Sequence, residues 1–280
     1  MILGIASGKG GTGKTTVAAN LAVCLPSPVR LLDCDVEEPN CHIFLKPDIQ
    51  STERITIPVP IVDENLCVGC GECSRVCRYN AMVTLKSKTL VFPELCHGCG
   101  GCWEICPEKA ISEGKRGIGT LSLGQAHQVS IVQGLLDIGQ ALSPPLIRAV
   151  NRHSLNNGIT IIDCPPGTSC PVITAVKKCD YVLLVAESSP FGLHDLKLAV
   201  ETLRKLNLNF GVVINRENAL NQSVADYCQK EEIPVLLQIP EERKAAEAYS
   251  RGTLLVEEVP GFRQLFEQLS ERILSEFDGT

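Results

Sequence analysis

A glycine-rich loop near the N-terminus constrains the fold of this chain more than any other segment. The apolar run 2–7 (ILGIAS) leads directly into residues 8–15 (GKGGTGKT), which satisfy the pattern GxxxxGK[ST], and a helical pattern follows at 14–25. A strand, a tight loop and a helix in this order form the setting in which the pattern binds a polyphosphate. The sequence therefore predicts a fold built around a bound nucleotide.

The residue types of the loop explain the expected affinity. Glycines let successive backbone N–H groups face the phosphates, and the N-terminus of the helix adds partial positive charge. Lys14 is expected to reach the β- and γ-phosphates, and the Thr15 hydroxyl can ligate Mg²⁺. A flexible turn is the other interpretation, but the complete pattern favours nucleotide binding. The predicted nucleotide-binding residues of the loop are Gly8, Lys9, Gly10, Gly11, Thr12, Gly13, Lys14, Thr15 and Thr16.

Short apolar runs alternate with helical patterns along most of the chain, which is typical of an α/β fold with a mostly parallel sheet and flanking helices. The predicted strands are 2–7, 29–33, 159–163, 181–187, 210–215 and 235–239, and the predicted helices are 14–25, 193–206, 222–231, 241–250 and 261–277. A hairpin is predicted at 119–139. The apolar stripe of the last helix predicts that this helix packs on the core, because acidic residues on its polar face disfavour membrane binding.

The cysteines point to metal ligation. The chain has 15 cysteines among 280 residues, and the segment 65–82 repeats itself at 94–111, with the spacing CxxCxxCxxxC in both copies. This match indicates an internal duplication. No secretory signal pattern is seen at the start, so we expect a cytoplasmic protein with reduced thiols. Because an odd count cannot pair completely, part of the set is expected to bind metal.

The duplicated segment is predicted to form a compact module inserted into the α/β domain. We expect the inserted module at 59–112 and the α/β domain at 1–58 and 113–280. The flanking stretches 56–63 (TIPVPIVD) and 113–119 (EGKRGIG) are interrupted by proline or rich in glycine and lysine. Such stretches are typical of linkers, and they are predicted as linkers here.

The two cysteine runs resemble those of two-cluster bacterial ferredoxins, in which the fourth cysteine of each run ligates the other cluster. The resemblance implies a small α+β ferredoxin-like domain with two [4Fe-4S] clusters. Zinc sites would instead have separated CxxC pairs. Pro107 follows the second run as in the family, whereas Arg78 replaces the corresponding proline of the first run. The implied ligand sets are Cys67, Cys70, Cys73 and Cys106 for one cluster, and Cys96, Cys99, Cys102 and Cys77 for the other.

The run KGGTGKTT at 9–16, with its early lysine, resembles the deviant Walker A motif of the MinD/Mrp/nitrogenase-iron-protein ATPases. The resemblance implies a MinD-like P-loop NTPase fold that binds ATP with Mg²⁺. It also implies that Lys9 reaches the nucleotide of a partner subunit and stabilises charge on the transferred phosphoryl group. A solvated loop lysine is the alternative interpretation of Lys9.

The same resemblance extends along the chain outside the cysteine module. The segment 31–40 (LLDCDVEEPN) implies that Asp35 orients or deprotonates the attacking water, while Asp33 is structural. The segment 159–171 (ITIIDCPPGTSCP) implies that Asp163 holds Mg²⁺ through water, and an Asp at the end of a parallel strand lies where such sheets bind ligands. The segments 212–216 and 239–252 imply that Asn215 and Pro240 contact the adenine.

Seven cysteines lie outside the duplicated runs, and most are predicted to be small buried hydrophobic residues. Cys170 follows Asp163 by seven residues, in the region where the nitrogenase iron protein carries a cysteine that holds a cluster across its dimer. A dimer-bridging cluster at Cys170 is therefore one hypothesis. It would need a second cysteine in each subunit, and the sequence does not identify one at the matching position.

Together these patterns predict a Mg²⁺-dependent ATPase with Lys9, Lys14 and Asp35 in catalysis. The leading hypothesis is an ATP-dependent homodimer, or a heterodimer with a paralogue, that transfers electrons to a redox partner. An iron–sulfur or metallocluster carrier of the Mrp type, which serves client metalloproteins, is the alternative. A MinD-type positioning ATPase that senses redox state is the third. Nucleic-acid or anionic-membrane binding is disfavoured by 26 basic against 32 acidic residues, and the apolar runs are too short for a membrane anchor.

Overall fold

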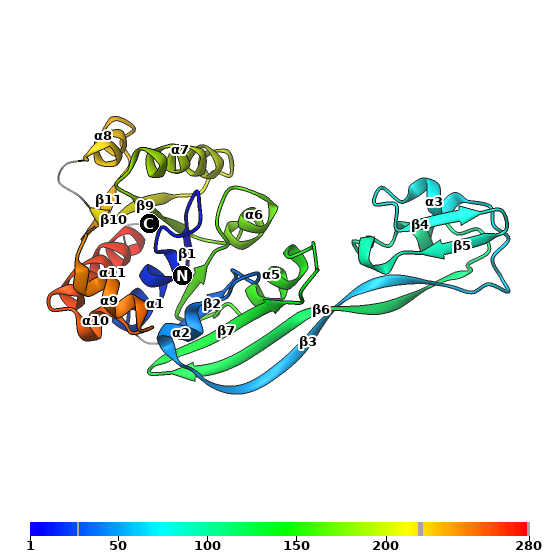
Figure 1. Ribbon diagram of the computed structural model, residues 1–280, viewed down its shortest axis with the longest axis horizontal. Coiled ribbons are helices and arrows are strands. Elements are labelled where there is room, and N and C mark those ends of the chain that lie inside the picture. The colour runs from blue at the N-terminus through cyan, green and yellow to red at the C-terminus, as the bar shows by residue number, and fades with distance from the viewer. Residues whose placement is uncertain (27, 218–220, 279–280) are drawn as a thin grey trace. The chain divides into compact units, whose positions relative to one another are not determined.

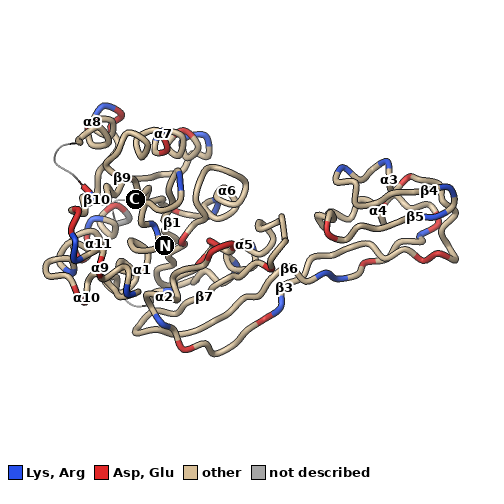
Figure 2. Tube along the Cα trace, viewed as in Figure 1, with Lys and Arg blue, Asp and Glu red and all other residues tan. Residues whose placement is uncertain are grey.

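The computed structural model describes residues 1–26, 28–217 and 221–278, and its chain divides into two compact units. The larger unit, here called the nucleotide unit, comprises 1–53, 121–135 and 146–280. The smaller unit, here called the cysteine unit, comprises 54–120 and 136–145, a wider span than the 59–112 expected for the inserted module. Along both units, Lys and Arg are interspersed with Asp and Glu (Figure 2).

A nine-stranded sheet has the order β11-β10-β9-β1-β8-β2-β7-β6-β3 (Figure 1). From β11 to β7, every neighbouring pair is parallel. The mostly parallel sheet predicted from the sequence is therefore confirmed, as are the six predicted strands. The strands are β1 (Ile2–Ala6), β2 (Val29–Asp33), β3 (Asp48–Val62), β6 (Ile111–Ala126), β7 (Val129–Leu136), β8 (Ile159–Asp163), β9 (Tyr181–Glu187), β10 (Phe210–Glu217) and β11 (Val235–Pro240).

Helices cover both faces of this sheet because successive residues of a buried strand point to opposite faces. Leu3 and Ile5 of β1 belong to the core that also contains residues of α1 and α11, whereas a Cβ on Gly4 would touch Cys179 and the end of α6. Figure 1 shows α1, α9, α10 and α11 on one side and α6, α7 and α8 on the other. The helices are α1 (Lys14–Cys24), α2 (Cys41–Leu45), α5 (Pro144–Asn151), α6 (Cys170–Val176), α7 (Pro190–Lys205), α8 (Ser223–Lys230), α9 (Arg243–Ser250), α10 (Leu255–Glu258) and α11 (Phe262–Asp278).

The last helix packs on the core, as its apolar stripe predicted. Phe262, Phe266, Leu269 and Ile273 of α11 are all buried in the main apolar cluster. Phe277 continues the apolar stripe in the sequence, and its side chain lies outside the described part of the structure. Among the described residues, no helix has the length and apolar character that crossing a membrane would require.

The two stretches predicted as linkers are instead parts of long strands. Residues 56–62 belong to β3 and residues 113–119 belong to β6. The prediction was wrong because proline was taken as a turn signal, whereas β3 is an edge strand. Pro58 and Pro60 occupy alternate positions, so both missing N–H groups lie along the same side of the strand, and an edge strand tolerates that. The hairpin predicted at 119–139 is confirmed, since only two residues separate β6 from β7.

The cysteine unit reproduces the sequence duplication in its backbone. Besides parts of β3 and β6, it contains α3 (Glu72–Val76), β4 (Met82–Leu85), β5 (Lys88–Val91), the 3₁₀ turn η1 (Pro93–Leu95) and α4 (Gly101–Glu104). Gly71 and Gly100 precede α3 and α4 with φ angles of 79° and 83°, a region that favours glycine. β4 and β5 form an antiparallel pair. The two repeats therefore share one backbone design.

Candidate functional site

The candidate nucleotide site is a pocket of about 470 Å³ at the carboxyl ends of the parallel strands, where open α/β sheets bind ligands. Lys14 and Thr15 line this pocket, together with Asp35, Asn215 and Pro240. Four further loop residues line it: Gly10, Gly11, Gly13 and Thr16. Gly8, Lys9 and Thr12 belong to the same loop and are absent from the lining among the described residues. The fold therefore brings the distant predicted segments together around one cavity.

Asn215 ties the end of β10 to the phosphate-binding loop. Its Nδ2 donates a hydrogen bond to the Thr12 carbonyl oxygen at 2.8 Å. Gly13, which precedes α1, has a φ of 92°, and a Cβ at this position would collide with the Asn215 amide. Glycine is therefore required at position 13 by both its backbone conformation and this close approach.

Thr15, which lines the pocket, and Asp163, which is not among the described lining residues, form a pair of side chains that fits Mg²⁺. The Thr15 Oγ1 donates a hydrogen bond to Asp163 Oδ2 at 2.6 Å, and Asp163 is fully buried at the end of β8. Burial raises the pKa of Asp163, while Lys14 and the Thr15 hydrogen bond oppose the rise. A hydroxyl beside a carboxylate, close to the lysine predicted to bind phosphate, offers the oxygen ligands that Mg²⁺ prefers.

Asp35 carries a carboxylate suited to proton transfer. It lines the pocket, and burial raises its pKa from 3.8 to about 6, although the charge of Lys14 acts in the opposite direction. A carboxyl group with a pKa near the working pH is an effective general base. The location is consistent with the role that the sequence implied for Asp35, which stays a prediction.

Asp33 holds the segment that carries Asp35. It is fully buried, and its carboxylate accepts hydrogen bonds from the backbone N–H of Asp35 at 3.2 Å and of Cys41 at 3.0 Å. Burial, followed by the nearby charge of Asp163, raises the pKa of Asp33 well above its usual value. These contacts fit the structural role expected for Asp33.

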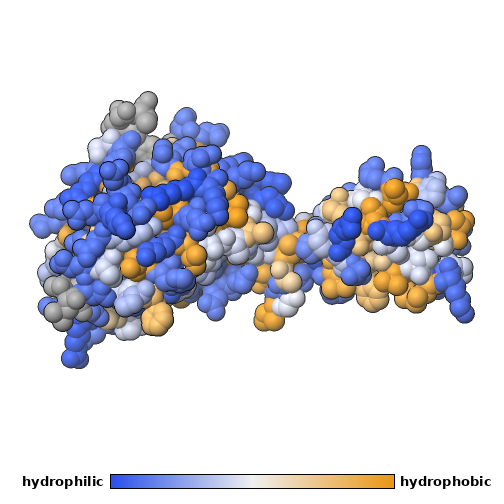
Figure 3. Space-filling model, turned by 90° about the horizontal axis from the view of Figure 1, so that it is seen from above, coloured by the Kyte–Doolittle hydropathy of each residue, from blue (hydrophilic) through white to orange (hydrophobic). Residues whose placement is uncertain are grey.

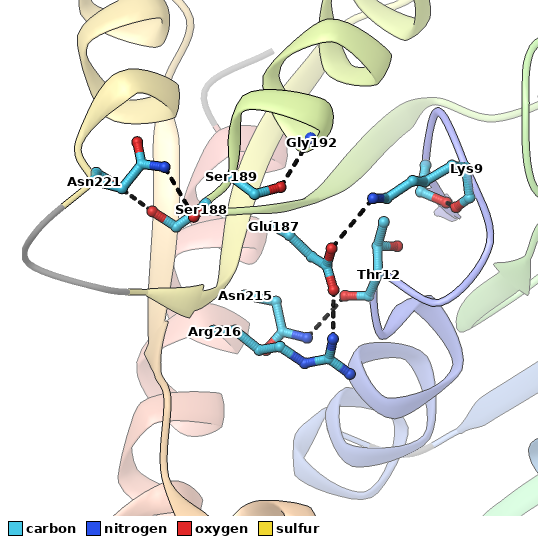
Figure 4. A network of polar contacts seen from close by, with 10 residues as sticks. Lys9, Thr12, Glu187, Ser188, Ser189, Gly192, Asn215, Arg216 and Asn221 are labelled. Carbon is cyan, nitrogen blue, oxygen red and sulfur yellow. Dashed lines mark hydrogen bonds and ion pairs between the residues drawn. The ribbon is translucent and has the colours of Figure 1, made fainter.

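Lys9 points to acceptors in its own chain (Figure 4). Its Nζ lies 3.3 Å from Glu187 Oε2, and the other carboxylate oxygen of Glu187 pairs with Arg216. Sequence reasoning missed Glu187 and Arg216. Glu187 is the last residue of β9, and Arg216 lies near the end of β10. The carboxyl ends of these strands lie at the same sheet edge as the loop after β1. That edge position was the signal that could have identified them.

The eight duplicated cysteines gather around two separate cavities of the cysteine unit. Each cavity takes three cysteines from one repeat and the fourth from the other. Cys67, Cys70, Cys73 and Cys106 line the first cavity, and Cys77, Cys96, Cys99 and Cys102 line the second.

Backbone N–H groups approach two thiols of the duplicated runs. The backbone N–H of Ala81 points to Cys77 Sγ at 3.3 Å, and that of Ala110 points to Cys106 Sγ at the same distance. These pairs occupy equivalent positions of the two repeats. N–H groups directed at sulfur stabilise thiolates and adjust the potential of clusters that they ligate. Four thiols around each cavity are therefore a donor set that fits an iron–sulfur cluster.

The remaining cysteines mostly behave as predicted. Five of the seven are buried, Cys24 is partly buried, and Cys170 is exposed at the start of α6. The bridging-cluster hypothesis for Cys170 stays a prediction. The five buried cysteines are Cys34, Cys41, Cys164, Cys179 and Cys228.

Comparison with known proteins agrees with this geometry. Residues 3–256 match the family model described as the CobQ/CobB/MinD/ParA nucleotide binding domain. The chain belongs to this family. It is thus a nucleotide-binding P-loop ATPase of the MinD/ParA class, as the loop and the later motifs predicted.

Individual relatives have low sequence identity to this chain. An uncharacterized protein of Methanocaldococcus jannaschii is 33% identical over 226 residues, which cover 79% of this chain and 80% of the relative. An iron-sulfur cluster carrier protein of Pyrococcus horikoshii is 26% identical over 296 residues, covering 98% and 85%. The solved structure of the septum site-determining protein MinD of P. horikoshii, complexed with Mg-ADP, has a TM-score of 0.62 at 22% identity and covers 97% of this chain and 95% of that chain. This last likeness shows a shared fold.

Proposed function

We propose that this ATPase couples ATP-dependent pairing of two chains to electron transfer through two [4Fe-4S] clusters held by the cysteine unit. The observation that carries the proposal is the sorting of eight cysteines into two sets of four around separate cavities, in the same polypeptide as a complete P-loop pocket. The inserted cluster domain would lie at 59–112, within the cysteine unit, and reduced thiols would require a cytoplasmic location.

In the nucleotide unit, each residue would act on ATP or on the attacking water. The loop N–H groups would bind the phosphates, and Lys14 would neutralise charge on the β- and γ-phosphates. Thr15 and Asp163 would hold Mg²⁺, which supplies charge neutralisation on the phosphate oxygens. Asp35 would accept a proton from the attacking water. Asn215 and Pro240 would bind the adenine.

Pairing of two chains would depend on Lys9. In the single chain, this lysine pairs with Glu187, so its charge is neutralised within its own unit. Reaching the nucleotide of a partner chain would require the exchange of Glu187 for phosphate oxygens. Phosphate carries more negative charge than one carboxylate, so bound ATP in a partner would favour this exchange. The partner would be a second copy or a paralogue.

In the cysteine unit, the two thiol sets would hold the clusters, which supply one-electron carriers when bound. Exposed apolar side chains surround the cavities and support contact with a redox partner. Val68 lines the first cavity and is 62% exposed, and Tyr79 lines the second and is 41% exposed. Figure 3 shows that hydrophobic side chains gather on this unit.

The coupling would travel along the chain itself. The segment that carries Asp35 ends in α2, and β3 follows directly. β3 begins in the nucleotide unit and continues into the cysteine unit at Arg54. A change in the conformation of residues 34–41 on hydrolysis would therefore act on the strand that leads to the cysteines.

An iron–sulfur cluster carrier is the second candidate function. The observation that favours it is the similarity to the iron-sulfur cluster carrier protein of P. horikoshii over 98% of this chain. A carrier must release iron to a client or chelator during ATP turnover, whereas an electron-transfer protein keeps it. A MinD-type positioning role with redox sensing is the third candidate, and it predicts a moving or polar pattern of a fluorescent fusion in cells.

Anaerobic purification with iron and sulfide analysis, combined with EPR, tests the proposal. We expect about eight irons and eight sulfides per chain and the EPR signals of reduced [4Fe-4S] clusters. Bound zinc without sulfide would contradict the proposal. Addition of a chelator during ATP turnover separates the first two functions, because only the carrier is expected to lose iron.

A further inference from the structure

We propose that Asp33, Cys41 and Asp163 form a binding site for a thiophilic divalent cation of the Zn²⁺ class, beneath the phosphate-binding loop. Each residue offers one ligand atom, and these atoms all lie within 4.8 Å of one another. All three side chains are fully buried. The site lies in the nucleotide unit and shares no residue with the eight duplicated cysteines.

Two neighbouring strands carry the two carboxylates of the site, and a helix carries its thiol. β2 and β8 are parallel neighbours in which Asp33 and Asp163 are paired in register, so the two carboxylates end adjacent strands side by side. Cys41 begins α2, and its backbone N–H donates to Asp33 Oδ2 at 3.0 Å. The thiol is thereby anchored over the carboxylate pair.

One carboxylate oxygen of this set has no hydrogen-bond partner among the described residues. Cys41 Sγ donates to Asp163 Oδ2 at 3.4 Å, a weak hydrogen bond. Asp163 Oδ1 is buried and has no hydrogen-bond partner among the described residues. A buried carboxylate oxygen without a partner is costly, and native structures nearly always supply one in the form of a protein group, water or ion. This orphaned oxygen is the observation that points to a cation.

The ligand types decide which cation fits. Mg²⁺ and Ca²⁺ bind oxygen ligands, whereas thiolate and carboxylate together suit Zn²⁺. Zinc–ligand distances of about 2.0–2.3 Å place ligand atoms roughly 3.3–3.8 Å apart in a tetrahedron. The distance of 3.4 Å between Cys41 Sγ and Asp163 Oδ2 lies in this range. Binding would release the Cys41 thiol proton to solvent, so two carboxylates and one thiolate would face the divalent charge. Burial raises the pKa of the Cys41 thiol, and the positive charge of the cation would oppose this rise.

The shared Asp163 makes the two metal states exclusive. Thr15 and Asp163 fit Mg²⁺ in the ATP-bound state, while the thiophilic cation would draw Asp163 toward Asp33 and Cys41. The cation would therefore hold the nucleotide unit in a state that cannot bind Mg-ATP. Through this site, free thiophilic metal would inhibit ATP binding in the same chain that carries the duplicated cysteines.

Cadmium binding to the full-length chain tests this inference. Cluster-loaded protein of constant iron content is titrated anaerobically with Cd²⁺, without nucleotide, and binding is followed by equilibrium dialysis and by the ultraviolet thiolate-to-cadmium absorption. Wild-type protein is expected to bind about one more Cd²⁺ per chain than Cys41→Ser. Asp33→Asn, which keeps the shape of the side chain, is expected to show the same loss. Excess Mg-ATP is expected to displace this cation from the wild type.

The matched control is Cys34→Ser. Cys34 is buried on the same segment, but its thiol donates to Asn151 Oδ1 at 3.2 Å, so removing it is expected to leave cadmium binding unchanged. The inference is overturned if Cys41→Ser binds as much Cd²⁺ as the wild type, if Cys34→Ser loses as much as Cys41→Ser, or if Mg-ATP leaves binding unchanged. Because the readout is cation binding at constant iron content, it does not depend on the proposed electron transfer.

Discussion

The two units differ in what fills their interiors. The nucleotide unit has a large apolar core to which strands and helices from both ends of the chain contribute, including β1, α1 and α11. In the cysteine unit, the buried cluster consists of Met82 and Ile111 with Cys73 and Cys102, and Cys77 and Cys106 pack against it. Thiols thus occupy the positions that apolar side chains fill in the larger unit. The comparison indicates that the nucleotide unit folds through its own core. Under the proposed function, the cysteine unit would need its clusters to complete the interior.

Their binding groups differ in the same way. Several polar groups of the nucleotide site already have partners within the chain, as in the Thr15–Asp163 and Lys9–Glu187 pairs. Binding there exchanges one set of contacts for another. The cysteines converge on cavities instead, with few hydrogen bonds to the sulfur atoms. The first site is therefore suited to reversible switching, whereas the cysteine cavities would, under the proposed function, hold clusters that stay bound.

The largest effect is expected from a substitution in the nucleotide unit that leaves the cysteine unit unchanged. Lys14→Ala is expected to lower the rate of ATP hydrolysis by about 10²- to 10³-fold, because the phosphate charge loses its main cationic partner. Iron content is expected to stay at the wild-type value. A coupled ATPase assay and iron analysis on the same preparation check both parts. Lys178→Ala, at an exposed position, is the matched control, and equal losses in the two variants would contradict the assignment of Lys14.

The second prediction concerns the stability of the cysteine unit without iron. Removal of iron by a chelator under anaerobic, reducing conditions is expected to abolish amide protection in the cysteine unit, since its core then lacks the metal. Protection of β1, β8 and β9 is expected to change little. Hydrogen exchange measured by mass spectrometry, with and without iron, reports both units at once. Persistent protection of the cysteine unit after complete iron loss would show that its core does not depend on metal.

A third prediction concerns pH. Asp35 has a raised pKa of about 6, and a general base acts only when deprotonated. The value of kcat/KM for ATP hydrolysis is therefore expected to fall about tenfold for each pH unit below about 6 and to level off above it. Asp35→Asn is expected to have low activity and to lack this acidic limb. A wild-type profile that is flat between pH 5 and 7 would refute the role of Asp35 as the base.

The smallest effect is expected on the ATP-dependent pairing of two chains. Glu187→Gln removes the carboxylate that neutralises Lys9 and Arg216. The variant is expected to pair about two- to fivefold more tightly in the presence of ATP, because freeing Lys9 no longer breaks an ion pair. Sedimentation velocity across a concentration series measures this. Glu201→Gln breaks an exposed pair with Lys205 and serves as the control, and weaker pairing of Glu187→Gln would contradict the model.

Much of the nucleotide unit could be predicted from the sequence because its signals are local. The loop at 8–15 follows a strand and precedes a helix, and Asp163 ends an apolar run, so both could be located without tertiary information. The wrong prediction of linkers at 56–63 and 113–119 has the opposite cause. Proline and glycine signal turns in local sequence, whereas the tolerance of Pro58 and Pro60 in β3 depends on its position at the sheet edge.

Contacts that depend on tertiary structure could not be predicted. The pairing of Lys9 with Glu187 requires that β9 lie beside β1, and sequence order does not specify that neighbour. The position of Cys41 beside Asp33 and Asp163 follows from the path of residues 34–40. In the cysteine unit, by contrast, the resemblance to two-cluster ferredoxins implied how the eight cysteines would be divided, because in that family the fourth cysteine of each run ligates the other cluster. The linings of the two cavities follow the same division.

Nucleotide control of electron delivery is the central claim, and one measurement tests it most directly. The protein is reduced anaerobically, mixed in a stopped-flow instrument with a one-electron acceptor dye, and reoxidation is followed with Mg-ATP, with a non-hydrolysable ATP analogue and with Mg-ADP. The account predicts faster reoxidation with Mg-ATP than with the other two nucleotides, and loss of this acceleration in Lys14→Ala. Equal reoxidation rates with Mg-ATP and with the analogue would contradict it.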